Sequence, residues 1–193
     1  PQHTTGTAGM DEISKLMIEQ LRDAHSAEKQ AMRAMQKMMR QAGSDRLKQG
    51  LQAHLDQTEG QIERLEQAFE HLGGKPGRKV CEAMRGIVEE ATQDMSEAER
   101  GPMMDVVIIS AAQRIEHYEI ASYGTMTALA KSAGLEDLAS LLHATLVEEK
   151  RMDEDLSRLA EEEVNPAWIE AAREEEMASA NENRRGGGRR KAG

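Results

Sequence analysis

The chain of 193 residues is poor in several residue types, and each shortage excludes a class of protein. Aromatic residues make up 2% of the sequence and β-branched residues are sparse, which disfavours a sheet-rich fold. Cys81 is the single cysteine, so no intramolecular disulfide can form, and a reducing compartment is favoured. No apolar run approaches the roughly 20 residues of a membrane-spanning helix. Residues 1–9 are polar and contain no apolar signal core, so a cytoplasmic location is expected.

Positive charge is also scarce. The net charge of −10 argues against nucleic acid as the main partner. The exception is a basic, Gly-rich tail, whose segment from Arg184 to Arg190 could make weak contact with nucleic acid or another anionic surface. We expect this tail, residues 181–193, to be disordered, and the polar lead of residues 1–9 likewise.

Helix-forming residues are abundant by contrast, and Ala, Leu, Met, Glu, Gln and Arg dominate the sequence. Apolar residues recur at helical spacing and predict helices over residues 10–42, 45–72, 79–95, 103–132 and 136–163. Asn165 and Pro166 are a cap and first-turn signal for a short last helix within residues 164–180. The 13 methionines indicate a flexible helical core rather than a methionine-based metal site.

An internal repeat relates the two halves of this helical region. Gly43 matches Gly134 at an offset of 91 residues, and at the same offset Met35 matches Met126. Four leucines of the first half also match four of the second: Leu47, Leu51, Leu55 and Leu65 match Leu138, Leu142, Leu146 and Leu156. The region is therefore predicted to consist of two related helical hairpins.

A long connection, residues 73–102, joins the two hairpins and contains its own helix. Long crossovers are typical of ferritin-like four-helix bundles rather than simple up-and-down bundles. The predicted fold is therefore an all-α, ferritin-like four-helix bundle over residues 10–163. If the crossover returns along the bundle, the first and fourth long helices run one way and the second and third the other.

Three acidic residues interrupt the apolar stripes near the middle of their helices: Glu28, Glu119 and Glu149. Glu28 and Glu119 are equivalent in the repeat. Buried carboxylates are costly unless they are paired or bind a metal, and three at one level repel one another. A single inward Glu is often an ion-pair partner or reaches the surface, but three at matched levels favour a metal site.

Three further residues extend this candidate site to one side. Glu116 precedes Glu119 by three residues, Asp153 follows Glu149 by four, and His54 precedes Thr58 by four, so each keeps nearly the same helix face. A ligand set rich in oxygen, with little nitrogen and no thiolate, favours iron or manganese over zinc or copper. His54 alone would more often be a histidine at the core edge.

The second long helix is the weak point of the site. Di-metal proteins with this fold use a Glu from two helices and Glu-x-x-His from the other two. Glu149 is followed three residues later by Met152, and the equivalents on the second helix are Thr58 and Gln61. Neither helix therefore carries the full motif.

Four stretches of the sequence resemble a known family: SAEKQ (26–30), HLDQTEGQIERLEQ (54–67), AAQRIEHYEIASYGTM (111–126) and TLVEEKRMDEDLSRLA (145–160). They are similar to the YciE/YciF-like family of bacterial ferritin-like stress proteins. The resemblance implies a ferritin-like fold, a homodimer, and a centre of two iron or manganese ions like that of rubrerythrin. It matches the family's acidic positions to Glu28, Asp56, Glu116, Glu119, Glu149 and Asp153. Gln57 stands where the family usually has Glu.

Three functions remain open at this stage. The first is a metal protein acting on peroxide or oxygen, in which Tyr118 and Tyr123 either relay an electron or only pack. The second is a non-enzymatic structural stress protein with a vestigial or purely structural metal site. The third is a metal store, which needs a shell of many subunits that nothing in the sequence encodes.

Overall fold

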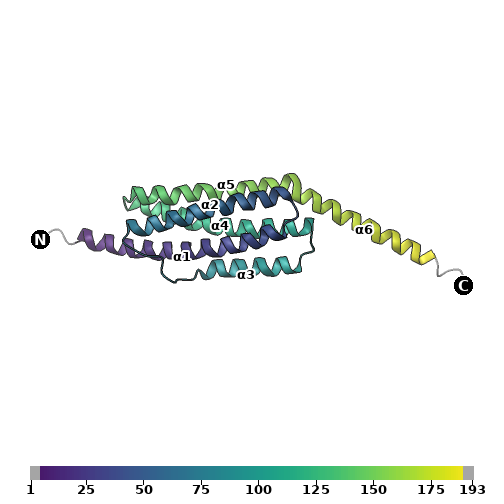
Figure 1. Ribbon diagram of the computed structural model, residues 1–193, viewed down its shortest axis with the longest axis horizontal. Helices are drawn as coiled ribbons and strands as arrows, with labels where there is room; N and C mark the ends of the chain where they lie inside the picture. The colour runs from purple at the N-terminus through teal and green to yellow at the C-terminus, as the bar shows by residue number, and fades with distance from the viewer. Residues whose placement is uncertain (1–4, 189–193) are drawn as a thin grey trace.

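The computed structural model describes residues 5–188, and the side chains of residues 10–182, as helices joined by turns and short loops (Figure 1). The four long helices are α1 (Thr5–Gln41), α2 (Asp45–His71), α4 (Pro102–Ser132) and α5 (Glu136–Leu159). Figure 1 shows α1 and α5 running in one direction and α2 and α4 in the other. The predicted four-helix bundle with a returning crossover is confirmed.

The crossover helix α3 (Glu82–Glu97) packs against α1 and α4 and runs parallel to α1 (Figure 1). Cys81 is its N-cap and is buried, with its sulfur accepting the N–H of Met84 at 3.4 Å. The backbone N–H of Cys81 donates to Ser26 Oγ at 2.9 Å, which ties the start of α3 to α1.

The turn between α1 and α2 is held by a side chain of α4. The backbone N–H groups of Gly43 and Ser44 donate to the two oxygens of the Asp105 carboxylate at 2.6 and 2.9 Å. A Cβ at Gly43 would lie 3.1 Å from Asp105 Oδ2, so this glycine permits the close approach. Ser44 caps α2 by accepting the N–H of Leu47 at 3.2 Å.

The equivalent turn between α4 and α5 needs its glycine for a different reason. Gly134 has a φ of 72°, a left-handed conformation that side chains with a Cβ rarely adopt. The N–H of Leu135 donates to the carbonyl of Ala130 at 2.9 Å, which closes the last turn of α4 as a Schellman motif. The two glycines matched by the repeat are therefore needed for different reasons: Gly43 for a close approach of Asp105, and Gly134 for its left-handed backbone.

The C-terminal region departs from the prediction. The chain passes from α5 through one π-helical segment, η1 (Ala160–Val164), into α6 (Asn165–Gly188), with no break at the expected cap of Asn165. The N–H of Asn165 donates to the carbonyl of Ala160, five residues back, so the hydrogen-bond ladder shifts by one residue just before Pro166. Figure 1 shows α6 projecting beyond the end of the bundle.

The predicted disorder of both chain ends also differs from the structure. Residues 5–9 belong to α1 and residues 181–188 to α6, although both segments are rich in Gly, Thr or Asn, which are weak helix formers. Residues 1–4 and 189–193 lie outside the described residues. Within residues 5–188, no helix has the length and apolar character that crossing a membrane requires.

The apolar core is divided into two parts along the bundle axis. One contains Leu47, Leu51, Met84 and Ile108, and the other contains Leu21, Leu65, Phe69 and Met126. Between them the four long helices contribute buried polar residues: Glu28, His54, Thr58, Gln61, Glu116, Glu119, Thr145 and Glu149. We call this set the polar layer.

Candidate metal centre

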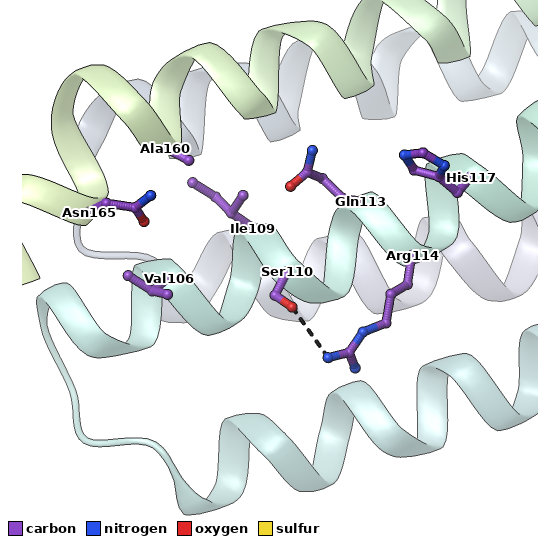
Figure 2. Close-up of a pocket in the computed structure, with 8 residues that line it drawn as sticks. All are labelled: Val106, Ile109, Ser110, Gln113, Arg114, His117, Ala160 and Asn165. Atoms are coloured by element: carbon purple, nitrogen blue, oxygen red, sulfur yellow. Dashed lines mark hydrogen bonds between the residues drawn. The ribbon is translucent and has the colours of Figure 1, made fainter.

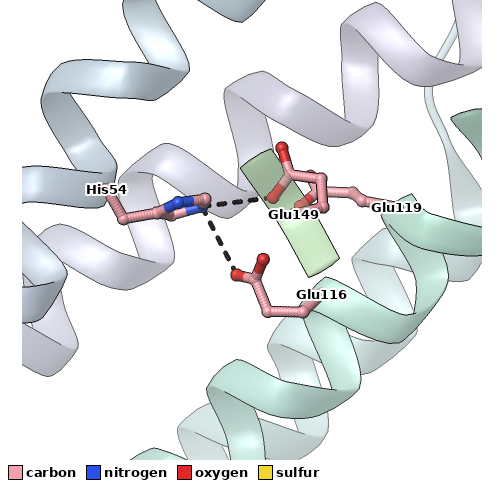
Figure 3. Close-up of side chains that lie close together, drawn as sticks. All are labelled: His54, Glu116, Glu119 and Glu149. Carbon is pink, nitrogen blue, oxygen red and sulfur yellow. Dashed lines mark ion pairs between the residues drawn. The ribbon is translucent and has the colours of Figure 1, made fainter. Parts of the chain in front are cut away.

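Four side chains of the polar layer converge on one point. His54 comes from α2, Glu116 and Glu119 from consecutive turns of α4, and Glu149 from α5. One ligand atom of each lies within 4.8 Å of all the others. Figure 3 shows the His54 ring facing Glu116 and Glu149, with Nε2 at 3.4 Å from Glu116 Oε1 and 3.6 Å from Glu149 Oε2.

These side chains have no hydrogen bonds to satisfy them. Among the described residues, both carboxyl oxygens of Glu116, Glu119 and Glu149, and Nδ1 of His54, are buried without a hydrogen-bond partner. Buried polar atoms in native proteins are almost always paired, so such a group calls for an ordered water or an ion. Three carboxylates and one imidazole form a donor set that suits iron or manganese. The residues present therefore fit a metal ion.

The protonation of the centre reflects its burial. Burial raises the pKa of Glu116 and Glu119 well above the usual range, and neighbouring carboxyl groups raise it further. Burial also raises the pKa of Glu149 to about 7. For His54 burial has the opposite effect and lowers the pKa to about 4, so the imidazole is neutral at neutral pH. A neutral imidazole is the form that binds a metal.

Glu28 reaches the polar layer from α1 but lies outside the four-residue cluster. It is buried, and its Oε1 accepts a hydrogen bond of 2.5 Å from the Tyr123 hydroxyl. Burial, followed by the charge of Glu149, raises the pKa of Glu28, while the Tyr123 hydrogen bond and the charge of Arg64 oppose that rise. Glu28 therefore has a protein partner where the clustered carboxylates have none.

Two acidic candidates face away from the centre. Asp153 Oδ1 accepts a hydrogen bond from Gln113 Nε2 at 3.1 Å and lies 3.2 Å from Nε2 of the exposed His117. Asp56 is exposed and accepts a hydrogen bond from Gln52 at 2.8 Å. The structure therefore brings together four of the six predicted metal residues, places Glu28 beside them, and leaves Asp153 on the outer face of α4 and α5.

Gln113 and His117 belong to an open groove along α4, next to η1, that Figure 2 displays. The guanidinium of Arg114, which lines this groove, already has partners. It pairs with Glu90 and Asp94 at 3.1 Å each and donates to Ser110 at 3.2 Å. The groove holds no cluster of unpaired groups comparable to that of the polar layer. The chemistry of the molecule therefore points to the buried centre.

Sequence reasoning missed the network on the α2 side of the layer. Arg64 donates from Nε to Thr145 Oγ1 at 3.0 Å and pairs with Glu148, which also accepts a hydrogen bond from Gln61 Nε2 at 3.1 Å. Arg64 and Glu148 look like surface residues in the sequence. Their positions, three residues after Gln61 and one before Glu149, are the only signal that could have placed them here.

Fold and site together define a class: a ferritin-like four-helix bundle with a buried carboxylate and histidine cluster. The family described as a domain of unknown function, DUF892, matches residues 12–168, and the chain belongs to that family. It is 44% identical over 157 residues to protein YciF of Escherichia coli (strain K12), which spans 81% of this chain and 95% of that protein. The resemblance to YciF-like proteins seen in the sequence is confirmed.

Solved structures agree with this membership. The crystal structure of the E. coli stress protein YciF covers 79% of this chain and 97% of that one, at a TM-score of 0.75 and 44% identity. A putative structural protein from Rhodopseudomonas palustris covers 75% and 92%, at a TM-score of 0.73 and 41% identity. Ferritin-like, diiron-carboxylate proteins from Bacillus anthracis match at a TM-score of 0.60 over 76% and 96%, and at 19% identity show the fold alone.

Proposed function

We propose that this protein binds iron or manganese through His54, Glu116, Glu119 and Glu149 and uses the metal to react with peroxide or oxygen. The carrying observation is the group of six buried carboxyl oxygens without a hydrogen-bond partner, together with His54. The bound metal supplies the redox chemistry. The name of the E. coli relative, a stress protein, and the diiron-carboxylate proteins that share the fold support this proposal.

The chain's own residues supply binding and shielding. Three carboxyl groups and a neutral imidazole converge from three helices, so the bundle holds the donor atoms without loops. The two apolar core clusters on either side keep bulk water from the centre. Metal binding displaces the protons that burial retains on Glu116, Glu119 and Glu149, so metal affinity increases with pH.

The test is a measurement of bound iron and manganese after reconstitution, followed by an assay of peroxide consumption. Glu119→Gln removes a charge from the centre at nearly constant volume and is expected to abolish both. Glu59→Gln, at an exposed position of α2, is the matched control and retains both. A folded wild-type protein that retains less than about 0.3 iron or manganese ion per chain after reconstitution would contradict the proposal.

The second candidate is a non-enzymatic structural stress protein, favoured by the description of the R. palustris relative as a putative structural protein. In that case the metal is structural or absent. A metal-loaded protein that is stabilised but leaves peroxide and oxygen unchanged would identify this alternative.

A homodimer and a cytoplasmic location are proposed from the family resemblance and composition. Light scattering of the purified protein tests the first, and a cage-sized particle would instead favour a metal store. Fractionation of the source cells tests the second. Weak nucleic-acid contact through the segment from Arg184 to Arg190 stays a prediction, because those side chains lie outside the described ones.

A further inference from the structure

We propose that the centre holds one metal ion per chain rather than two, because protein side chains on α2 and α1 fill the place of the second ion. This inference rests on the metal-binding function proposed above and specifies its stoichiometry. It departs from the pair of ions that the family resemblance implies.

The internal repeat shows which ligands for a second ion are missing from α2. A symmetric pair of ions needs a carboxylate and an imidazole from α2 as well as from α5. The α2 equivalents of Glu149 and Met152 are Thr58 and Gln61. The Thr58 hydroxyl donates to the carbonyl of His54 in its own helix at 3.0 Å, so its proton is directed at the backbone. Neither residue brings a negative charge to compensate a second cation.

A permanently charged cation, the Arg64 guanidinium, already lies on the α2 side of the polar layer. The Arg64 guanidinium pairs with Glu148, one residue before Glu149, and donates to Thr145, four residues before it. Gln61 donates to the same Glu148 carboxylate at 3.1 Å. Arginine does not lose its proton at accessible pH, and a dication placed next to it would be repelled. The ion pair of Arg64 and Glu148 therefore occupies the interface between α2 and α5, and its two charges neutralise each other.

The remaining candidate ligand for a second ion is Glu28, which is already engaged. Its Oε1 accepts the short hydrogen bond from Tyr123, and a metal at that oxygen would have to displace a buried hydroxyl from its acceptor. The charges of Arg64 and Glu148 both act on the pKa of Glu28, the first lowering it and the second raising it.

The distribution of unpaired atoms gives the same answer. The unpaired carboxyl oxygens belong to Glu116, Glu119 and Glu149, and with His54 these residues form the one cluster found among the described residues. On α2, apart from Nδ1 of His54, the unpaired atom is Gln61 Oε1, a neutral amide oxygen. One ion can take a donor atom from each of these four residues, and beyond Glu116, Glu119 and Glu149 no described carboxylate of the layer is left without a partner for a second ion.

The deciding experiment uses the full-length protein, stripped of metal and dialysed against Mn²⁺. Elemental analysis is expected to find about one manganese per chain, and electron paramagnetic resonance is expected to show the resolved hyperfine pattern of an isolated Mn²⁺ ion. About two ions per chain with an exchange-coupled spectrum would overturn the single-ion inference and leave the proposed function intact. A folded chain that binds no metal would overturn the proposed function itself.

Two variants test the cause. Thr58→Glu with Gln61→His installs the missing motif while keeping Arg64, and is expected to hold about one ion. Adding Arg64→Leu removes the guanidinium and is expected to raise the count about twofold. A second ion in the first variant would overturn the role of Arg64. Circular dichroism checks folding, and the wild-type count decides the inference if a variant unfolds.

Discussion

At the level of single residues, the dominant cost in this molecule is a set of carboxyl groups held away from water. Glu28, Glu116, Glu119 and Glu149 are all buried, and the pKa of each is raised, chiefly by burial. Without metal, the folded chain holds protons that the unfolded chain releases near pH 4.5. Stability and metal binding are therefore both linked to pH.

We expect the metal-free protein to lose stability as the pH rises from about 7 to about 8.5. A carboxyl whose folded pKa is raised stabilises the fold fully below its unfolded pKa, and this contribution is lost through the folded pKa, about 7 for Glu149. The pKa values of His25 and His54 are lowered, so both stay neutral above pH 7 and do not offset the loss. Urea unfolding at several pH values measures this slope.

The control for this slope is Glu149→Gln, which cannot titrate and should give a shallower decline. A metal-free protein that gains stability over the same pH range would contradict the raised pKa values.

The hydrogen bond between Tyr123 and Glu28 should matter for stability. Tyr123→Phe keeps the ring but leaves Glu28 Oε1 without a partner in a buried place, at an expected loss of about 1–3 kcal/mol. Tyr118→Phe is the matched control, because Tyr118 is half-buried and its partner Asp23 reaches solvent, so its loss should be smaller. Equal losses in urea unfolding of the two variants would show that the buried hydrogen bond is not special.

Residue-level prediction succeeded where the signal was a polar group inside an apolar stripe. Glu28, Glu119 and Glu149 stand at such positions, and the structure buries all three. Asp153 was misplaced because four residues after Glu149 is far enough around the helix for Gln113 to capture its carboxylate. Arg64 was missed, because apart from its spacing of three residues after Gln61 an arginine gives the same signal in sequence whether it faces solvent or a buried acid.

At the level of elements, the two inter-helix turns show that equivalent sequence does not mean equivalent geometry. Gly43 allows a carboxylate of α4 to approach the backbone, whereas Gly134 supplies a left-handed residue. The repeat predicted both turns, but the reason for each glycine lies in tertiary contacts that the local sequence does not contain.

Two glycine substitutions are expected to have opposite signs. Gly134→Ala forces a Cβ into the left-handed region and should destabilise the protein by about 1–2 kcal/mol. Gly50→Ala, inside α2 with nothing within 4 Å of the added Cβ, should stabilise it by about 0.5–1 kcal/mol. The midpoints of urea unfolding compare the two, and a stabilising Gly134→Ala would refute the assignment of strain.

The end of the bundle was the least predictable element. Asn165 and Pro166 are a reliable start signal for a helix, yet the structure continues through them because a π-helical segment precedes the proline. A proline inside a regular α-helix removes a hydrogen bond and clashes with the preceding turn. No local sequence rule distinguishes a break from a shifted ladder at this point.

At the scale of the whole molecule, the bundle and α6 contribute unequally to stability. Val164 is the last fully buried apolar residue described, and the side chains of residues 172–182 are exposed. We expect removal of residues 176–193 to change the free energy of unfolding by less than about 0.5 kcal/mol and to leave the metal content unchanged. A larger loss would show that α6 contacts something beyond the bundle described here, and light scattering would test for a second copy.

The polar layer also affects how the helices are aligned with one another along the bundle axis. A bundle lined only by Leu, Met and Ala could let one helix slide by a turn at little cost, since similar side chains would meet again. Such a slip in this molecule would move Glu149 or Glu116 into an apolar core half and pull His54 out of reach. The layer thus makes one axial alignment much more favourable than its neighbours, even before any ion arrives.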